Sequence, residues 1–307
     1  MTRRVMLVTH PSRPEAPDLA KAFAERLEAH GIEVETVPEA EPTHEVVSTD
    51  AIAAQKSPVP PHVDATDCEL VVVFGGDGTI LRGAEIARPA VTPLLGVNLG
   101  RVGFLAEAER EDVDAIVTHI VEREYHVEER MTLEVDVLHE GRVVCSNWAL
   151  NEASVEKSAR ERMLEVAVEV DGRPLSTWGC DGVVMATPTG STAYAFSGGG
   201  PVVWPDVEAL LLVPISAHAL FARPLVLGPD TELAVEVVPH SYVTGVMWCD
   251  GRRTVELPPG ARIEVRRSRT PVLLARFTRA PFADRLVAKF ALPVGGWRGP
   301  VGRKTPP

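Results

Sequence analysis

The sequence predicts an α/β N-terminal domain with a parallel sheet, followed by a β-rich C-terminal domain whose strands are mostly antiparallel. Three observations predict this division of the 307 residues. Strand and helix patterns alternate over residues 1–125, apolar residues then recur at every second position over 126–280, and helical spacing returns over 281–295. The length fits two domains, because one domain takes about 150 residues. We expect the helix at 281–295 to complete the first domain and the tail at 296–307 to fray.

The strands of the first domain are expected to run parallel. Leu70–Phe74 is a continuous apolar run, which is typical of a strand buried on both faces of a sheet. Strands and helices alternate around this run, and that order predicts parallel strands joined by crossover helices. Residues 38–66, rich in Pro, Glu, Asp and Thr, are expected to form a long connection. The elements expected are strands at 5–9, 32–37, 70–74 and 94–98 and helices at 18–30, 80–87 and 112–122.

The second domain is expected to consist of antiparallel strands. Several of its segments, such as the one that begins at Met131, alternate apolar and polar residues with a period of two. Short turns of an acidic residue followed by glycine separate several of these segments, and such pairs are typical of β-hairpins. The turn pairs are Glu140-Gly141, Asp171-Gly172 and Asp250-Gly251.

Composition narrows the class of protein. Lys and Arg number 31 against 43 Asp and Glu, and the formal charge of −12 argues against a nucleic-acid binder, which needs a basic face. An anionic substrate must then be held by a local positive patch, because the overall field repels it. The longest uncharged run near the middle, Ala209–Ala222, is too short to span a membrane. Four separated cysteines without a CxxC pair indicate free thiols in the cytoplasm, and the histidines show no metal-ligand spacing.

The strongest signal for chemistry is the sequence GGDGT, which stands between the buried strand and a helix. Its glycines let the backbone approach a ligand closely and adopt positive φ angles. The helix start offers free N–H groups and about half a positive charge, which suits a phosphate. Because a carboxylate repels phosphate, Asp77 is expected to serve a hydroxyl, a metal ion or the turn itself; the alternative is a plain turn in which Asp77 caps the helix. The candidate phosphate-loop residues are Gly75, Gly76, Gly78 and Thr79.

Two further segments point to a nucleotide. Asn151-Glu152 lies in an uncharged, apolar stretch, and an amide beside a carboxylate can bind a base edge and a sugar hydroxyl together. The alternative for this pair is a β-turn. Asp181–Pro201 combines hydroxyl residues, an aromatic residue and a glycine run, so that it offers N–H groups and a stacking face. Its alternative is a solvent loop between strands.

These three segments together resemble the NAD kinase family, and more closely its actinobacterial members. The match runs along nearly the whole chain. GGDGT alone is shared with phosphofructokinases and with diacylglycerol and sphingosine kinases, whereas TPTGSTAY together with the Asn-Glu pair separates NAD kinases from them. The other segments that resemble family signatures are Val97–Glu107, Ser216–Leu225 and Cys249–Arg253.

The resemblance implies a GGDGT-kinase type of first domain, an NAD-binding second domain and a site between them. The implied enzyme phosphorylates the 2′-hydroxyl of the adenosine ribose of NAD, with ATP or inorganic polyphosphate as donor, and gives NADP. Asp77 resembles the general base of the family, and Gly78 and Arg82 resemble its neighbours in the NAD site. Arg252 stands where many relatives carry Gln. The remaining NAD-binding residues that the resemblance implies are Asn151, Glu152, Arg162, Asp181, Thr192, Ala193, Tyr194, Ala195, Phe196 and Ser197.

The chemistry of the residues agrees with this reaction. Phosphoryl transfer to a ribose hydroxyl needs alignment, charge neutralisation and an acceptor for the proton. Asp77 can accept that proton, and such help is worth about 10²- to 10⁴-fold in rate. We expect a divalent metal, Mg²⁺, to arrive with the donor rather than in a protein cage, and we expect no tightly bound prosthetic group. No Walker lysine is present, so arginines, with Arg82 best placed, must supply the local positive charge.

Two other functions could share part of this sequence signature. A lipid kinase could share GGDGT, but it would want an apolar tunnel or a basic membrane-facing patch, which the negative charge disfavours. A non-catalytic NAD(P) sensor would have no need for Asp77. His218 lies in an apolar stretch, where a hydrogen-bonded core role is the ordinary alternative to a functional one. The resemblance also implies a homo-oligomer, a dimer or tetramer, with neither nucleic acid nor membrane as partner.

Overall fold

The structure is a computed structural model, and it describes residues 2–10, 13–37, 63–100, 103–109, 112–160, 162–278 and 281–294. Most of the long connection expected at 38–66 and all of the tail expected at 296–307 lie outside these ranges. Within the described residues, no helix is long and apolar enough to cross a membrane.

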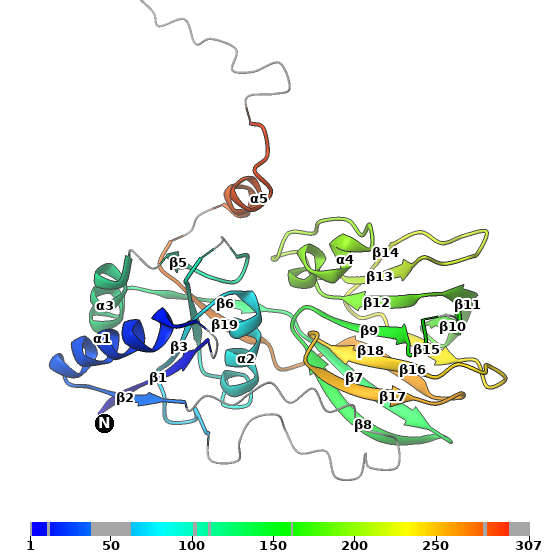
Figure 1. Ribbon diagram of the computed structural model, residues 1–307, viewed down its shortest axis with the longest axis horizontal. Coiled ribbons are helices and arrows are strands. Elements are labelled where there is room, and N and C mark those ends of the chain that lie inside the picture. The colour runs from blue at the N-terminus through cyan, green and yellow to red at the C-terminus, as the bar shows by residue number, and fades with distance from the viewer. Residues whose placement is uncertain are drawn as a thin grey trace, which may run out of the picture.

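The first domain contains a seven-stranded sheet in the order β2-β1-β3-β4-β19-β6, with β5 paired to β4. Every strand pair in it is parallel except β19 with β6, so the predicted parallel sheet is confirmed. Helices cover both faces, as Figure 1 shows. The strands are β1 (Arg3–Thr9), β2 (Ile32–Thr36), β3 (Leu70–Phe74), β4 (Leu94–Asn98), β5 (Ala108–Glu109), β6 (His126–Arg130) and β19 (Val272–Arg276), and the helices are α1 (Glu15–Ala29), α2 (Asp77–Ala87) and α3 (Val113–Glu122).

The strand β3 is buried along its whole length because helices pack on both of its faces. Leu70, Val72 and Phe74 point to the side where α1 and α3 pack. Val71 and Val73 point to the opposite side, against α2. Burying each such side chain stabilises the fold by roughly 1.5–3 kcal/mol, so β3 holds the loop that follows it, GGDGT, on a rigid support.

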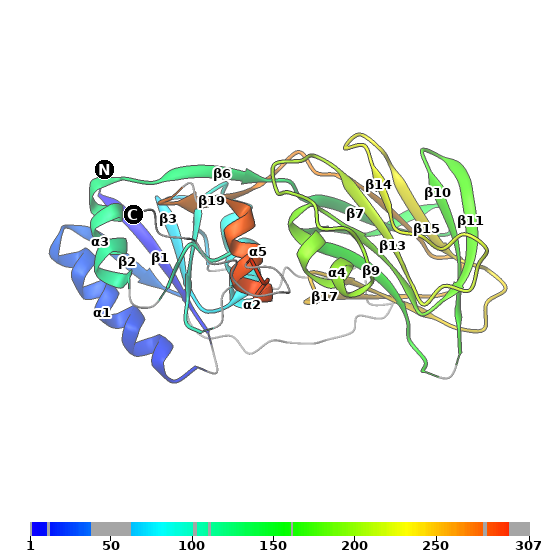
Figure 2. The same ribbon diagram turned by 90° about the horizontal axis from the view of Figure 1, so that it is seen from above.

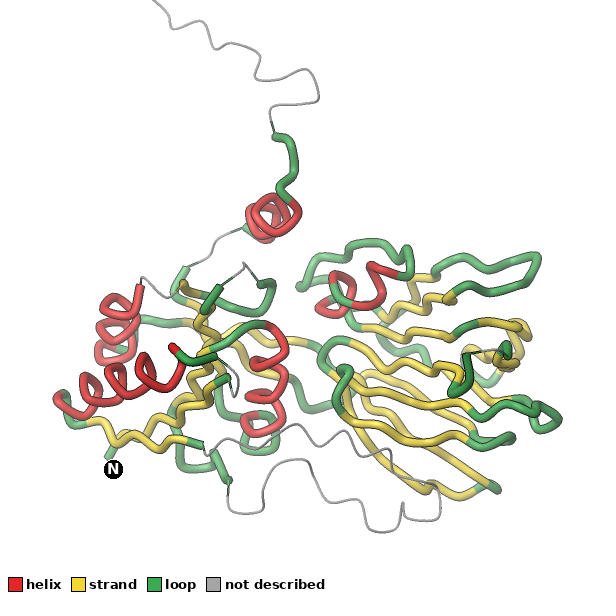
Figure 3. Tube along the Cα trace, in the orientation of Figure 1, coloured by secondary structure: helices red, strands yellow, loops and turns green. Residues whose placement is uncertain are grey.

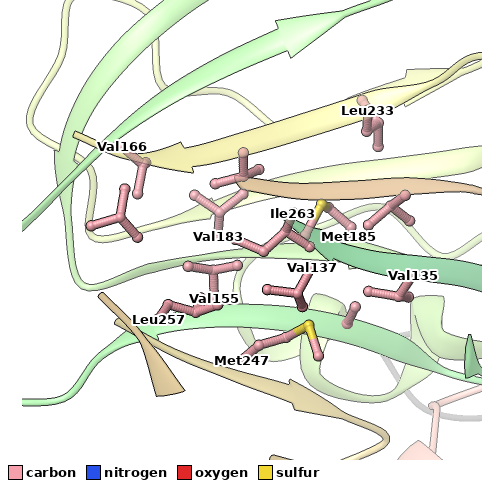
Figure 4. Packing of buried hydrophobic residues seen from close by; sticks show 14 of the residues in the cluster. Val135, Val137, Val155, Val166, Val183, Met185, Leu233, Met247, Leu257 and Ile263 are labelled. Atoms are coloured by element: carbon pink, nitrogen blue, oxygen red, sulfur yellow. The ribbon is translucent and has the colours of Figure 1, made fainter. Parts of the chain in front are cut away.

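The second domain consists of two six-stranded antiparallel sheets, in the orders β11-β10-β15-β18-β7-β8 and β14-β13-β12-β9-β16-β17. Their inner faces supply one apolar core, of which Figure 4 shows a part, and Figure 3 shows how few helices this half contains. Each predicted acidic–glycine turn has positive φ at both residues, as hairpin turns of this kind require. The strands are β7 (Leu133–His139), β8 (Arg142–Ala149), β9 (Glu152–Lys157), β10 (Leu164–Val170), β11 (Arg173–Cys180), β12 (Gly182–Ala186), β13 (Leu210–Ile215), β14 (Leu225–Leu227), β15 (Leu233–Val237), β16 (Gly245–Cys249), β17 (Arg253–Leu257) and β18 (Arg262–Arg267).

Two strands of the range 126–280 join the sheet of the first domain. The strand β19 pairs with β4 in parallel and with β6 in antiparallel orientation. Alternation with a period of two predicts a strand but does not tell which sheet the strand joins. The domain limits near 125 and 280 remain a prediction, and this pairing favours a second domain that begins after β6 and ends before β19.

The last described helix, α5 (Phe282–Phe290), contacts both domains rather than the first alone. Phe282 and Phe290 each lie 5.8 Å, between ring centroids, from Phe104 of the first domain. Phe290 also stacks on Phe196 of the second domain at 4.8 Å. Figures 1 and 2 place α5 on one side of the molecule, over the boundary between the domains. None of its residues is buried, so its contacts are easy to displace.

Candidate functional site

The GGDGT loop turns directly from β3 into α2, with Gly76 as N-cap and Asp77 as the first helical residue. The expected positive φ angles are absent from its glycines. Close approach explains Gly75 instead, because a Cβ there would lie 2.4 Å from the hydroxyl oxygen of Thr79. A Cβ at Gly76 or Gly78 would meet nothing within 4 Å, so the loop is open on that side. It therefore offers the free N–H groups of a helix start to a ligand.

The carboxylate of Asp77 is held by a second loop of the same domain. The N–H of Phe104 donates to Oδ2 and the N–H of Leu105 donates to Oδ1, both at 3.2 Å. A Cβ at Gly103 would lie 2.3 Å from Oδ1, so only glycine fits beside this carboxylate. A carboxylate has about four acceptor positions, which leaves Asp77 able to accept a further hydrogen bond from a substrate. Asp77 is the first helical residue rather than the N-cap, and its carboxylate accepts hydrogen bonds from the second loop.

Two arginines in turn hold this second loop. Arg276 donates to the carbonyl oxygen of Leu105 at 3.1 Å, and Arg285 of α5 donates to that of Ala106 at 2.7 Å. Both arginines form ion pairs with the buried carboxylate of Glu107, at 3.1 and 2.7 Å. Burial and the neighbouring arginines lower the pKa of Arg276 to about 10. Sequence patterns did not place this loop in the site, although its residues belong to the signature segment Val97–Glu107.

The Asn151-Glu152 pair is tethered by an aspartate far along the chain. The carboxylate of Asp250 accepts the N–H groups of Leu150, Asn151 and Glu152 at 3.0, 2.7 and 3.3 Å. Arg253 pairs with the same carboxylate at 2.7 Å. The backbone at this turn is thereby fixed, which leaves the side chains of Asn151 and Glu152 available for a ligand.

Glu152 is a buried carboxyl group with an altered acidity. Its side chain reaches the start of α4 (Tyr194–Ser197), where the N–H of Tyr194 donates to Oε2 at 3.4 Å. Burial, and next the negative charge of Asp250, raise the pKa of Glu152 to about 8. Such a shift in a polar site marks a candidate for ligand binding.

The segment 187–197 packs on the Asn-Glu turn. Thr187 donates its hydroxyl to the carbonyl oxygen of Leu150 at 2.6 Å. A Cβ at Gly190 would lie 2.0 Å from the carbonyl oxygen of Asn151, so this approach requires glycine. The structure thus brings together the two segments that the sequence singled out separately. Of the candidate residues here, Ala195 is buried, Thr192, Ala193 and Tyr194 are half-buried, and Phe196 and Ser197 are exposed.

Three other candidates lie away from Glu152. Asp181 precedes β12, whose far end pairs with Glu152, and five residues of strand span about 16 Å. Asp181 forms an ion pair with Lys157 at 2.5 Å, and that contact lowers its pKa. His218 is exposed and donates its backbone N–H to Gly179, so its interpretation as a core residue is wrong. Arg162 is exposed as well.

The two halves of the site adjoin through α2. Leu150, the residue before the Asn-Glu pair, is buried in the same apolar cluster as Ile80 and Leu81 of that helix. Glu85 of α2 forms ion pairs across the boundary with Arg252 at 3.2 Å and Arg253 at 3.4 Å. Arg252 therefore serves a contact between domains in this structure.

The surroundings of α2 offer one candidate source of positive charge. Arg82 lies on α2, one turn beyond Gly78, and is half-buried. Within the described ranges, no group of three or more His, Cys, Asp and Glu residues could hold a metal ion. The described residues therefore do not fit a metal ion held by the protein alone.

Comparison with known proteins extends this picture. Family models for the ATP-NAD kinase N-terminal domain and the ATP-NAD kinase C-terminal domain match residues 5–125 and 150–277. NAD kinase 2 of Streptomyces coelicolor is 59% identical over 306 residues, with 97% of each chain covered. The NAD kinase of Thermobifida fusca is 59% identical over 302 residues, covering 97% of this chain and 92% of the relative.

Two solved structures have the same fold. An NAD kinase from Archaeoglobus fulgidus in complex with ATP has a TM-score of 0.69 at 27% identity and covers 94% of this chain and 98% of that one. Yeast NADH kinase complexed with NADH has a TM-score of 0.79 at 24% identity, and the match covers 99% of this chain and 90% of the yeast chain.

Proposed function

Since the chain belongs to the ATP-NAD kinase family, we propose that it phosphorylates the 2′-hydroxyl of the adenosine ribose of NAD and so forms NADP. One observation carries the proposal. The helix that begins at Asp77 shares an apolar cluster with Leu150, which precedes the Asn151-Glu152 pair. A carboxylate suited to a hydroxyl and a pair suited to a nucleoside thus lie on adjoining elements.

In this proposal Asp77 orients the ribose hydroxyl and accepts its proton as the phosphoryl group arrives. Its carboxylate is fixed by two backbone N–H groups and half-buried, so it does not need to reorganise during the reaction. The transition state of phosphoryl transfer is loose, so correct alignment of the hydroxyl contributes as much as proton removal. Gly76 and Gly78 leave space beside the carboxylate for the pyrophosphate of the dinucleotide.

We assign NAD binding to the turn at Asn151-Glu152 and to the segment 192–197. Asn151 and Glu152 would bind the adenosine, and Tyr194 lies where Glu152 accepts an N–H group. A ligand that hydrogen-bonds Glu152 would offset the cost of its burial, because that cost is what raises the pKa of the carboxyl group. Asp181 and Arg162, at the far end of β12 and beyond, would contact a more distant part of the extended ligand.

The phosphoryl donor is proposed to be ATP or inorganic polyphosphate, with a divalent cation, Mg²⁺, bound to its phosphates. A cation of this kind neutralises charge on the transferring group. Arg82 would add local positive charge on α2. A location in the cytoplasm stays a prediction from the sequence.

A homo-oligomer of two or four subunits is also proposed. Support comes from large apolar side chains that the single chain leaves in solvent, among them Leu220, Phe221 and Tyr242. Surfaces of this kind commonly mark sites of protein association. Sedimentation equilibrium would test this part, and a monomer at micromolar concentration would contradict it.

The direct test of the function is an assay of NADP formation. Purified protein is incubated with NAD and with ATP, polyphosphate or no donor, each with and without Mg²⁺. We expect NADP only where both a donor and Mg²⁺ are present. Diacylglycerol serves as a control acceptor, and phosphate transfer to it in place of NAD would contradict the proposal.

A further inference from the structure

We propose that Glu85, Arg253 and Asp250 are positioning residues, which set the NAD-binding turn at a fixed distance from Asp77. This inference rests on the proposed function, because it concerns how the two halves of that site are held together. Asp77 begins α2 and Glu85 lies two turns further along the same helix. Asp250 lies at the end of the β16–β17 hairpin in the second domain.

The three residues form a continuous chain of contacts across the domain boundary. Glu85 pairs with Nε of Arg253 at 3.4 Å, and Arg253 pairs through Nη2 with Asp250 at 2.7 Å. Asp250 then accepts the N–H groups of Leu150, Asn151 and Glu152. The helix that carries the base is therefore linked through two ion pairs to the backbone of the turn assigned to NAD.

Burial and stacking make this chain of contacts rigid. The side chains of Glu85, Asp250 and Arg253 are exposed by 4%, 2% and 8%. The guanidinium of Arg253 stacks on Trp148 at 4.4 Å from the ring centroid, and that of Arg88, the C-cap of α2, contacts the same ring at the same distance. A guanidinium fixed by a ring and by two carboxylates has few alternative orientations.

Stability alone is a poor explanation for these buried charges. Burying ion pairs costs desolvation, and well-packed apolar residues often stabilise a fold as well or better. Ion pairs do, however, define one geometry, whereas apolar contacts can slide. An enzyme whose base lies on one domain and whose substrate binds to the other needs a single fixed geometry between them, because a shift of about 1 Å can lower the rate about 100-fold.

The link predicts a specific division of effects between binding and turnover. When Glu85 loses its charge, Asp250 and Arg253 still hold the Asn-Glu turn, so the second domain keeps its NAD-binding shape. The turn is no longer fixed relative to α2, so the bound hydroxyl meets Asp77 less often. We therefore expect kcat to fall while the Kd for NAD stays nearly constant.

The experiment compares Glu85→Gln with a control that breaks an ion pair elsewhere. Glu169→Gln is the control, because Glu169 of β10 pairs with Arg262 of β18 at 2.8 Å, and both strands belong to the second domain. For Glu85→Gln we expect kcat to fall at least about tenfold with the Kd for NAD, from calorimetry, within about twofold. For Glu169→Gln we expect both constants unchanged. Equal kcat values in Glu85→Gln and wild type would overturn the proposal.

A second pair of variants covers the case in which Glu85→Gln fails to fold. Arg252 also pairs with Glu85, and its side chain is partly exposed. We expect Arg252→Ala to lower kcat and Arg252→Lys to recover part of it, with circular dichroism and Tm close to wild type. A loss of kcat that only follows the loss of folded protein would assign these residues a structural role and overturn the proposal.

Hydrogen exchange separates this proposal from the function on which it rests. Exchange at the N–H groups of 150–152 should speed up in Asp250→Asn and stay slow in Glu85→Gln, whatever the enzyme's substrate. If wild type forms no NADP, the proposed function fails, and this exchange pattern still reports on the link. If wild type forms NADP and exchange at 150–152 is the same in all three proteins, the link itself is wrong.

Discussion

The two domains hold their candidate carboxyl groups in opposite ways. Asp77, in the first domain, is half-buried, accepts two backbone N–H groups and stands beside open space at Gly76 and Gly78. Glu152, in the second, is buried and accepts one N–H group, and burial, followed by the negative charge of Asp250, raises its pKa to about 8. The first arrangement suits a group that meets a substrate hydroxyl, and the second suits a group that binds.

This difference fits the proposed function, in which the two carboxyl groups have separate roles. A carboxylate that is held in place by N–H donors and faces open space can receive a substrate hydroxyl and accept its proton. A carboxyl group buried beside a like charge resists ionisation, so at neutral pH it mostly keeps its proton and can donate or accept a hydrogen bond with a sugar hydroxyl. Substitutions at or beside each carboxyl group would test this division of roles.

The largest effect is expected from Asp77→Asn. This change removes the charge but keeps the shape, so kcat should fall at least about 100-fold, in keeping with the loss of a general base. The Kd for NAD, measured by calorimetry, should change little because the second domain is untouched. Turnover close to that of wild type would remove Asp77 from the mechanism.

The next effect is expected from Gly103→Ala, which disturbs Asp77 without replacing it. The new Cβ would lie 2.3 Å from Oδ1, so the carboxylate or the loop must move. We expect kcat to fall by about 10- to 100-fold through misplacement of the base. Gly228→Ala is a matched control, since its Cβ would meet only Thr231 at 3.9 Å. Equal kcat values in the two variants would mean that the position of Asp77 is not critical.

Glu152→Gln is expected to act mainly on binding and on the pH dependence of stability. Loss of the carboxyl group should raise the Kd for NAD by about tenfold, which is about 1.4 kcal/mol, and change kcat less. An unchanged Kd would assign Glu152 to the turn alone.

The pH dependence follows from the raised pKa of Glu152. Its usual value is 4.5 and its folded value about 8, so between these values the unfolded chain has released a proton that the folded chain keeps. The contribution of Glu152 to the free energy of unfolding of the wild type therefore falls as pH rises from about 5 to 8, by up to about 1.4 kcal/mol per pH unit. Chemical denaturation of Glu152→Gln at these pH values should lack this contribution; parallel curves for both proteins would contradict the shift.

The smallest effect is expected from Phe290→Ala in α5. Phe290 contacts the first domain through Phe104 and the second domain through Phe196. Such aromatic pairs contribute about 0.5–1.5 kcal/mol each. Because α5 is exposed, we expect Tm to fall by only a few degrees and kcat by less than about threefold. A collapse of activity would show that α5 takes part in the chemistry.

Local patterns in the sequence predicted most of the elements and the place of the GGDGT loop between a strand and a helix. The uninterrupted run at Leu70–Phe74 identified a strand buried on both faces, and the glycines after it identified the loop that contains Asp77. The acidic–glycine turns adopted the expected backbone. These features depend on neighbours in the chain, so a single sequence contains the information needed.

Contacts between distant residues could not be predicted in this way. Phe104 reaches Asp77 across 27 positions, and Arg252 reaches Glu85 across 167. Nothing in the pattern around Glu85 distinguishes it from a solvent-facing helix residue. The same reason explains the error at His218, where an apolar neighbourhood in the sequence belongs to an exposed loop.

The most direct test of the whole account is a crystal structure of the protein with NAD bound. We predict that the 2′-oxygen of the adenosine ribose lies within hydrogen-bonding distance of the Asp77 carboxylate, at about 2.6–3.2 Å. Asn151 and Glu152 should contact the same adenosine. An adenosine ribose bound beyond the reach of Asp77, with its 2′-hydroxyl turned to solvent, would contradict the account.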